Sequence, residues 1–229
     1  MSLTQDTYIN NPEKVAKYID GVLKFVPGYQ SVHTMAIQLI SEKVTDAAKI
    51  LVVGAGGGLE LKAFASIKHK WRFMGVDPSS EMINLAKITC DGLLDRIQFH
   101  QGTIEDAPKE LYDAATCLLV LHSIPDNGEK LHTLKEIRNR LKPGAPFIIV
   151  NLSLDKKSSD AETMYNRYTQ YSILSGADID YATKCKWELK NEMKSVSPQR
   201  DEQLMKEAGF SGITLFYVGL SWRGWVTYA

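Results

Sequence analysis

Between residues 49 and 152, short apolar runs alternate with segments of helical periodicity, and this alternation limits the fold more than any other feature of the chain. The predicted strands are Lys49–Val53, Arg72–Val76, Ile97–His100, Ala115–Leu121 and Pro146–Leu152, and the predicted helices are Leu59–His69, Ser80–Cys90 and Glu129–Leu141. Strands that are separated by single helices form βαβ units. The pattern therefore predicts a parallel sheet that is covered by helices on both faces.

The carboxy-terminal residues break this alternation. Ile213–Gly219 and Trp222–Tyr228 are two apolar runs joined by a short loop, which is typical of an antiparallel hairpin. We therefore predict an α/β fold, a three-layer αβα sandwich around a mostly parallel seven-stranded sheet with an antiparallel C-terminal hairpin. Residues 1–229 are expected to form one domain, with N-terminal helices at 11–46 and a helical insert at about 157–195.

Composition limits the partners and the compartment. The 27 Lys and Arg residues balance 27 Asp and Glu residues, which argues against a broad electrostatic attraction to nucleic acid or anionic lipid. No apolar run approaches the roughly 20 residues of a membrane span, and the amino terminus lacks the apolar stretch of a signal peptide. Cys90, Cys117 and Cys185 are far apart, so they suggest neither a disulfide framework nor a zinc site. We expect a cytoplasmic protein with a small-molecule substrate and no metal, nucleic acid or membrane partner, and a homodimer stays open.

A glycine-rich turn, Gly54-Ala55-Gly56-Gly57-Gly58, directly follows the first predicted strand. Open α/β sheets bind ligands at the carboxyl ends of their strands, and residues without a Cβ let a ligand approach the backbone. No Gly-Lys pair occurs in the chain, which excludes a phosphate-binding P-loop, and Leu59 stands where a dinucleotide GxGxxG motif has its third glycine. What remains is a GxGxG turn, which can serve a ligand or be only a tight turn.

An acid at the end of the second predicted strand favours the ligand. Asp77 lies 23 residues after Gly54. A carboxylate at that place can accept hydrogen bonds from both hydroxyls of a ribose. The two features together predict a ligand that contains adenosine.

Five motifs then resemble, in order and spacing, the class I S-adenosylmethionine-dependent methyltransferases. They are the glycine turn, Gly75–Met82 (GVDPSSEM), Gly102–Glu105 (GTIE), Tyr112–Asp113 with the strand that follows it, and Leu141–Gly144 (LKPG). The resemblance runs from about Val26 to Leu152 and again over Lys206–Phe210. It implies a Rossmann-like fold with S-adenosylmethionine as cofactor and S-adenosylhomocysteine as product. The residues that it assigns to the cofactor are Tyr29, Gly54, Ala55, Gly56, Gly58, Asp77, Pro78, Met82, Gly102, Thr103, Ile104 and Leu118.

Within that family, Val26-Pro27-Gly28-Tyr29 is similar to the VPGY segment of the carboxy-S-adenosylmethionine synthases. The resemblance implies that Tyr29 reaches the carboxylate of the cofactor's methionine part, although Tyr29 can equally pack the amino-terminal helix. Those synthases hold an extra carboxylate with an arginine in the insert, where this chain has Lys186, and they carry an asparagine where it has Leu118. Because lysine lacks the bidentate fork of arginine, we favour plain methyl transfer over carboxymethyl chemistry.

Two further positions depart from the family pattern. Val52 stands where most members carry an acid, so the ammonium group of the cofactor would rely on backbone carbonyls. Glu60 is near enough in sequence to substitute, but we expect it to be a solvated helix residue. Thr103 replaces an aspartate that often follows the glycine of the third strand.

Methyl transfer from a sulfonium is an in-line displacement, so alignment of the acceptor is the main task, and a general base is needed only for a protonated acceptor. His122, at the carboxyl end of the fourth predicted strand, is the candidate base, and packing against the cofactor is its alternative role. Tyr165 and Tyr168 lie near one face of a helix in the insert and, with Lys186, are candidate substrate residues; seating the insert on the core is their alternative. A non-catalytic domain that binds S-adenosylmethionine or S-adenosylhomocysteine stays the second functional hypothesis, beside a carboxy-S-adenosylmethionine synthase.

Overall fold

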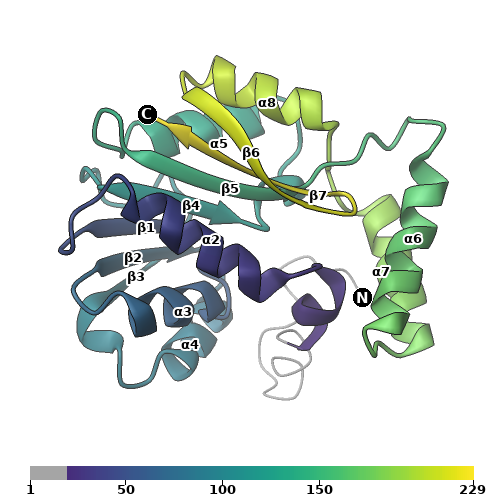
Figure 1. The fold of residues 1–229 in the computed structure, drawn as a ribbon, viewed down its shortest axis with the longest axis horizontal. Helices are drawn as coiled ribbons and strands as arrows, with labels where there is room; N and C mark the ends of the chain where they lie inside the picture. Colours follow the sequence, from purple (N-terminus) through teal and green to yellow (C-terminus); the bar gives the residue numbers. More distant parts are fainter. Residues whose placement is uncertain (1–19) are drawn as a thin grey trace.

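The computed structural model describes residues 20–229. Residues 11–19 of the predicted N-terminal helices, and most of the segment considered for a signal peptide, lie outside the described residues. Figure 1 shows one sheet with helices on both sides of it. The strands are β1 (Lys49–Val53), β2 (Arg72–Asp77), β3 (Ile97–Gln101), β4 (Ala114–Leu118), β5 (Pro146–Leu152), β6 (Ser211–Gly219) and β7 (Trp222–Tyr228).

The order of the strands is β3-β2-β1-β4-β5-β7-β6. The first five strands pair in parallel, whereas β7 is antiparallel to both of its neighbours, β5 and β6. This confirms the mostly parallel seven-stranded sheet with an antiparallel C-terminal hairpin. The direction of strand addition reverses at β1, because β2 lies on one side of it and β4 on the other. Such a switch point is where open α/β sheets form a ligand crevice.

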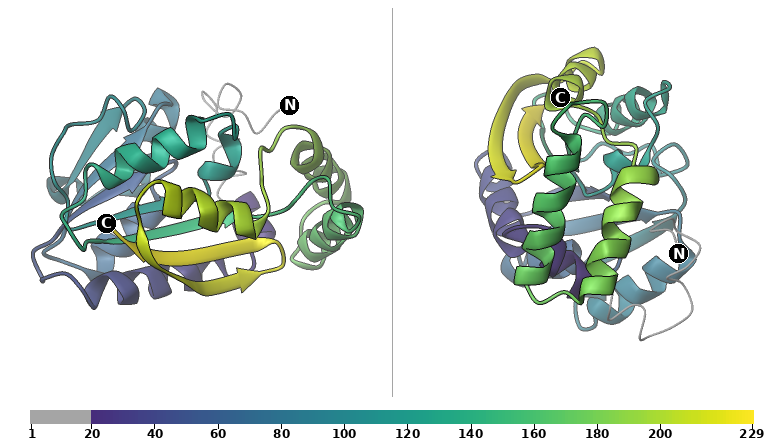
Figure 2. Two further views of the ribbon diagram at one scale, coloured as in Figure 1. Left: turned by 90° about the horizontal axis from the view of Figure 1, so that it is seen from above. Right: turned by 90° about the vertical axis from the view of Figure 1, so that its right-hand side faces the viewer.

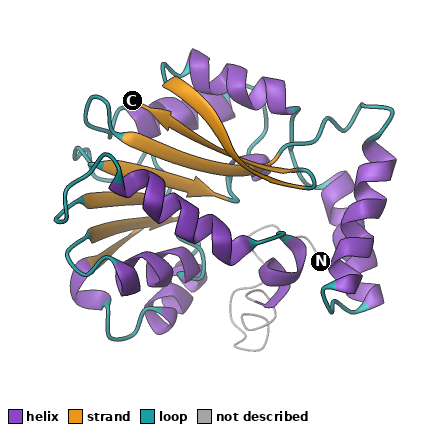
Figure 3. Ribbon diagram, viewed as in Figure 1, coloured by secondary structure: helices purple, strands orange, loops and turns teal. Residues whose placement is uncertain are grey.

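Helices cover both faces of the sheet, as Figure 3 shows. They are α2 (Tyr29–Ser41), α3 (Leu59–Ile67), α4 (Ser80–Thr89), α5 (Glu129–Arg138), α6 (Ala161–Leu174), α7 (Ile179–Asn191) and α8 (Pro198–Glu207). Val52 and Leu118 pack on the side of α2 and α3, whereas the adjacent Leu51 and Cys117 pack on the side of α5 and α8. Strands that are buried on both faces read as continuous apolar runs, which is why the sequence pattern identifies them. The predicted three-layer, Rossmann-like sandwich is confirmed.

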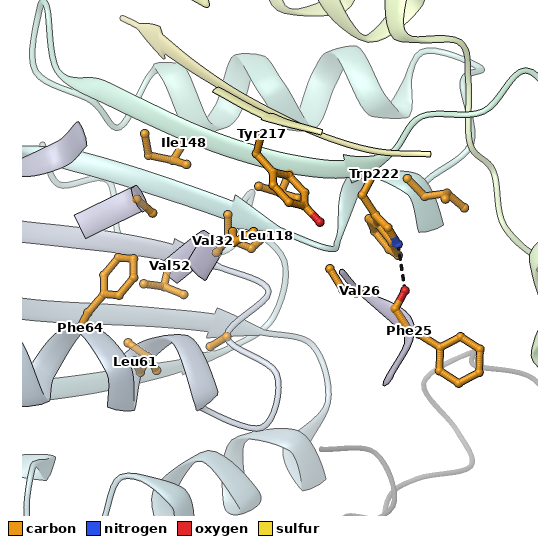
Figure 4. Close-up of a cluster of buried hydrophobic side chains, with 14 of the residues drawn as sticks. Phe25, Val26, Val32, Val52, Leu61, Phe64, Leu118, Ile148, Tyr217 and Trp222 are labelled. Carbon is orange, nitrogen blue, oxygen red and sulfur yellow. Dashed lines mark hydrogen bonds between the residues drawn. The ribbon is translucent and has the colours of Figure 1, made fainter. Parts of the chain in front are cut away.

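Helices α6 and α7 lie side by side at one end of the sheet (Figures 1 and 2). The tip of the C-terminal hairpin joins this pair to the segment before α2. The Trp222 indole Nε1 donates to the Phe25 carbonyl at 3.3 Å (Figure 4). The same Nε1 also donates to the Tyr168 hydroxyl at 2.7 Å. Tyr165 and Tyr168 are both buried in the core cluster on this side. The structure thus favours the seating role for these two tyrosines.

Two elements end three residues earlier than predicted. β4 ends at Leu118, because Leu119 adopts a left-handed backbone (φ +62°) and the chain then enters the 3-10 turn Leu121–Ser123. α5 ends at Arg138, because Leu141 forms a parallel bridge with Tyr112 instead of continuing the helix. Within residues 20–229, no helix is both long enough and apolar enough to cross a bilayer.

Candidate functional site

A cavity of about 570 Å³ opens at the carboxyl ends of β1, β2 and β4. Its walls come from the start of α2, the turns after these three strands, the segment after β3 and the first turns of α3 and α5. The predicted cofactor residues that line it are Tyr29, Gly54, Ala55, Gly56, Asp77, Pro78, Met82, Gly102, Thr103, Ile104 and Leu118. The structure therefore brings motifs that are separate in the sequence together around one cavity.

Gly54 begins the turn after β1 and packs directly against another wall of this cavity. Its backbone is left-handed (φ +75°), and its N–H donates to the Val76 carbonyl at 2.8 Å. A Cβ at this position would lie 2.1 Å from a methyl carbon of Val120, which also lines the cavity. Only glycine satisfies both the backbone conformation and this close approach.

Gly58 is the one predicted cofactor residue that does not line the cavity. A Cβ on it would lie 2.8 Å from the Cα atom of Ala86. Gly58 therefore allows the start of α3 to pack closely against α4, which supports the turn.

Asp77 connects the glycine turn to the start of α4. Its Oδ2 accepts the Gly56 N–H at 2.8 Å, and its Oδ1 accepts the Ser79 N–H at 2.9 Å. Burial raises the pKa of Asp77, while these two N–H donors lower it in part by favouring the carboxylate. Each carboxylate oxygen can accept more than one hydrogen bond, so Asp77 keeps capacity for ligand hydroxyls at the cavity wall.

The segment after β3 is held by hydrogen bonds with residues that do not line the cavity. The Thr103 N–H and hydroxyl both donate to Asp106 Oδ2 at 3.1 Å, so the Thr103 side chain closes a local turn. The guanidinium of Arg140 is buried and donates to the carbonyls of Glu105 and Ala107 at 3.1 and 3.0 Å. These bonds hold the Thr103–Glu105 wall in place.

His122 directly precedes the lining residue Ser123, but it does not line the cavity itself. Its ring is buried edge-on against Trp222, with 5.2 Å between the ring centroids, and its Nδ1 accepts the Leu152 N–H at 3.4 Å. Burial lowers the pKa of His122 to about 3, which keeps the ring neutral. These contacts favour a packing role over that of a general base.

None of the three predicted substrate residues lines the cavity. Tyr165 and Tyr168 are in the core, as described above. Lys186 points to α6, where its Nζ donates to Glu162 Oε1 at 2.6 Å and to Asn166 Oδ1 at 2.7 Å. Its charge is therefore already paired within the insert.

Glu60 departs most clearly from expectation, because it is not a solvated helix residue. It is only 6% exposed and lines the cavity from the first turn of α3. Burial raises the pKa of Glu60 to about 7, and the neighbouring Thr116 hydroxyl opposes part of that rise. Neither Glu60 Oε1 nor Thr116 Oγ1 completes a hydrogen bond with any described residue.

Other lining residues were also missed. Ser123, Ile124 and Pro125 follow β4, and the carboxyl end of that strand was the signal that could have located them. Glu129 and Thr133 line the cavity from α5, and their spacing of four places them on one face of the helix. No local motif marks that face. Among residues 20–229, no group of three or more His, Cys, Asp and Glu side chains is arranged to hold a metal ion.

The raised pKa of Glu60 predicts a pH-dependent cost to stability. Because the folded state holds this proton up to about pH 7 and an unfolded glutamate loses it near 4.5, the cost appears as the pH rises between these values. Above about pH 7 this cost in the free energy of unfolding reaches its full value, on the order of 3 kcal/mol. We expect Glu60→Gln to stabilise the ligand-free protein more at pH 8 than at pH 5, as measured by urea unfolding. An equal change at both pH values would contradict this expectation.

Comparison with known proteins gives a family match at the same segment. Residues 50–144 match the family described as "Methyltransferase domain". The match begins in β1 and ends in the turn before β5, so it includes the glycine turn, Asp77 and the turn after β4.

Two curated relatives differ in how much of the chain they cover. A ubiquinone biosynthesis O-methyltransferase of Alkalilimnicola ehrlichii is 28% identical over 116 residues, which are 49% of this chain and 45% of the relative. The chain thus spans about half the length of that relative. A carboxy-S-adenosyl-L-methionine synthase of Nautilia profundicola is 24% identical over 219 residues, which are 94% of this chain and 91% of the relative.

The fold is also similar to solved structures. Human N-acetylserotonin methyltransferase, solved in complex with S-adenosylmethionine, superposes with a TM-score of 0.59 at 16% identity. The superposition covers 95% of this chain and 56% of the human protein. At this identity the likeness supports the three-layer fold.

Proposed function

This chain belongs to the class I S-adenosylmethionine-dependent methyltransferases, and from that premise we propose that it transfers the methyl group of S-adenosylmethionine to a small-molecule acceptor in the cavity described above. The observation that carries the proposal is that the glycine turn, Asp77 and Tyr29 all line one cavity. The residues fit this cofactor, since the close approach at Gly54 shapes the turn and Asp77 offers acceptors to a ribose.

The lining residues would hold the parts of the cofactor in turn. Asp77 would accept hydrogen bonds from the ribose hydroxyls, and Met82 and Ile104 would contact the adenine. The glycine turn would support the methionine part, and Tyr29 would donate its phenol O–H to the methionine carboxylate.

The cofactor, when bound, supplies a methyl group on an already activated carbon. The protein then has to hold the acceptor in line with that carbon and exclude water. Leu119 and Val120 give the cavity an apolar surface after β4, which would help to exclude water. No histidine lines the cavity among the described residues. We therefore attribute the rate of methyl transfer to alignment of the acceptor with the methyl group. If the acceptor is protonated, a carboxylate of the cavity wall would serve as its base.

A carboxy-S-adenosylmethionine synthase is the second candidate, because the relative with that name matches nearly the whole chain. An anionic substituent on the sulfur would need a cationic partner. The described cavity wall contains four acids, Glu60, Asp77, Glu105 and Glu129, and no Lys, Arg or His. Since like charges oppose each other in a buried site, this wall favours methyl transfer.

The experiment is incubation of the protein with methyl-deuterated S-adenosylmethionine and a metabolite extract, followed by mass spectrometry. We expect S-adenosylhomocysteine above background together with a deuterated acceptor. Cofactor binding without turnover would favour the non-catalytic domain, and a carboxylated form of the cofactor would favour the synthase. The Asp77→Ala variant serves as the control for product formed without this site.

A further inference from the structure

The end of β1 lacks the acid that is typical of the family, and the structure shows what occupies the space around it. Val52 is paired in register with Thr116 of β4. Both residues are fully buried, and alternate residues of a strand share one face, so Thr116 points to the same side as Leu118 and α3. A side chain that enters from α3 can therefore reach the place that a strand acid would fill.

Glu60 is that side chain. It lies in the first turn of α3, and it is near enough to the Thr116 hydroxyl for that group to favour its carboxylate. In this chain an acid on the helix therefore lies beside the strand position that valine occupies.

Glu60 also differs from the other acids of the cavity wall. Asp77 accepts two backbone N–H groups, Glu105 pairs with His132 at 3.0 Å, and Glu129 accepts from the Asn127 amide at 2.8 Å. Glu60 is 6% exposed, and its Oε1 completes no hydrogen bond among the described residues. A buried carboxylate oxygen that lacks a hydrogen bond is costly, so a group at this place is expected to serve a ligand.

The chemistry of that ligand follows from the surroundings. No cationic side chain among the described residues lines the cavity, so a cation that pairs with Glu60 has to arrive with the ligand. S-adenosylmethionine carries two positive groups, the sulfonium and the α-ammonium. Only the ammonium has N–H donors, and an N–H donor is what an unpartnered carboxylate oxygen and a hydroxyl require.

We propose that Glu60, with the Thr116 hydroxyl beside it, binds the α-ammonium group of the cofactor's methionine part and so replaces the missing acid of β1. This inference rests on the proposed function, because it names the residue that recognises one end of the same cofactor. It makes Glu60 the determinant of preference for ligands that retain the amino acid.

The test compares S-adenosylhomocysteine with 5′-methylthioadenosine, which keeps the nucleoside and the thioether but has no amino acid. Calorimetry on Glu60→Gln should show affinity for S-adenosylhomocysteine reduced about tenfold to hundredfold, the range expected when a hydrogen bond to a charged group is lost. Affinity for 5′-methylthioadenosine should stay within about twofold. The matched control is Glu188→Gln. Glu188 is also buried and its Oε1 forms no hydrogen bond, but it lies 3.9 Å from the Lys184 ammonium and does not line the cavity.

The outcomes separate this inference from the proposed function. Equal loss for both ligands, or no loss for either, would overturn the role of Glu60. Wild-type protein that binds neither ligand would instead contradict the cofactor site itself. Thr116→Val, which keeps the shape of a buried residue, provides a second variant and should weaken S-adenosylhomocysteine alone. Thermal unfolding without ligand checks the fold, and Glu60→Gln should unfold no earlier than wild type.

Discussion

Gly54→Ala should remove measurable binding of S-adenosylmethionine and lower the thermal unfolding temperature. The left-handed backbone at φ +75° costs a residue with a Cβ about 1 to 2 kcal/mol. The new Cβ also overlaps a Val120 methyl carbon at 2.1 Å, which adds about 1 to 3 kcal/mol of overpacking. Because Val120 and Gly54 both line the cavity, relief of this overlap moves the surface on which the cofactor would lie. Calorimetry and thermal unfolding measure the two effects.

Gly144 provides a matched control for the backbone part of this effect. It has nearly the same conformation, φ +76°, but a Cβ there would meet no atom within 4 Å. Gly144→Ala should therefore carry the backbone cost alone and leave cofactor binding unchanged. Equal losses of stability and affinity in the two variants would show that contact with Val120 has no special importance.

The strands could be predicted from the sequence because the sheet is buried on both faces. β1 and β5 have the predicted bounds, since their apolar runs coincide with the buried lengths of the strands. β4 could not be bounded in this way. Its apolar run continues to Leu121, but the chain leaves the sheet at Leu119, where a left-handed backbone begins the cavity wall. Hydrophobicity records burial, and it does not distinguish a strand from a buried turn.

Site residues could be predicted from the sequence where they form a motif within one turn. They could not be predicted where the orientation of a helix determines which side chains line the cavity. Glu60 looks like an ordinary polar position at the start of a helix. The signal that could have revealed its burial is its place on the buried stripe of α3, which contains Glu60, Leu61, Phe64 and Ala65. Spacing alone likewise did not say which way Tyr165 and Tyr168 face. The Tyr168 hydroxyl accepts from Trp222, which lies 54 residues later in the chain.

Asp77→Ala should weaken binding of S-adenosylmethionine by about 1.5 to 3 kcal/mol, or roughly tenfold to more than hundredfold. Part of this loss of affinity comes from a weakened turn and not from the ribose contact, because the Gly56 and Ser79 N–H groups lose their acceptor. Asp178→Ala measures that part away from the cavity, since Asp178 also accepts two backbone N–H groups, from Asp180 and Tyr181 at the start of α7. We expect this control to lose stability but no affinity.

The contact between Asp77 and the ribose can be measured separately by changing both the residue and the ribose hydroxyls. Wild-type protein should bind S-adenosylhomocysteine more tightly than its 2′,3′-dideoxy counterpart, because Asp77 accepts the hydroxyls that the second ligand lacks. In Asp77→Ala this preference should disappear, so that the two ligands bind with similar affinity. A preference that survives the substitution would place the hydroxyls on another residue. If both ligands also bind more weakly by the same factor, the role of Asp77 is only to brace the glycine turn.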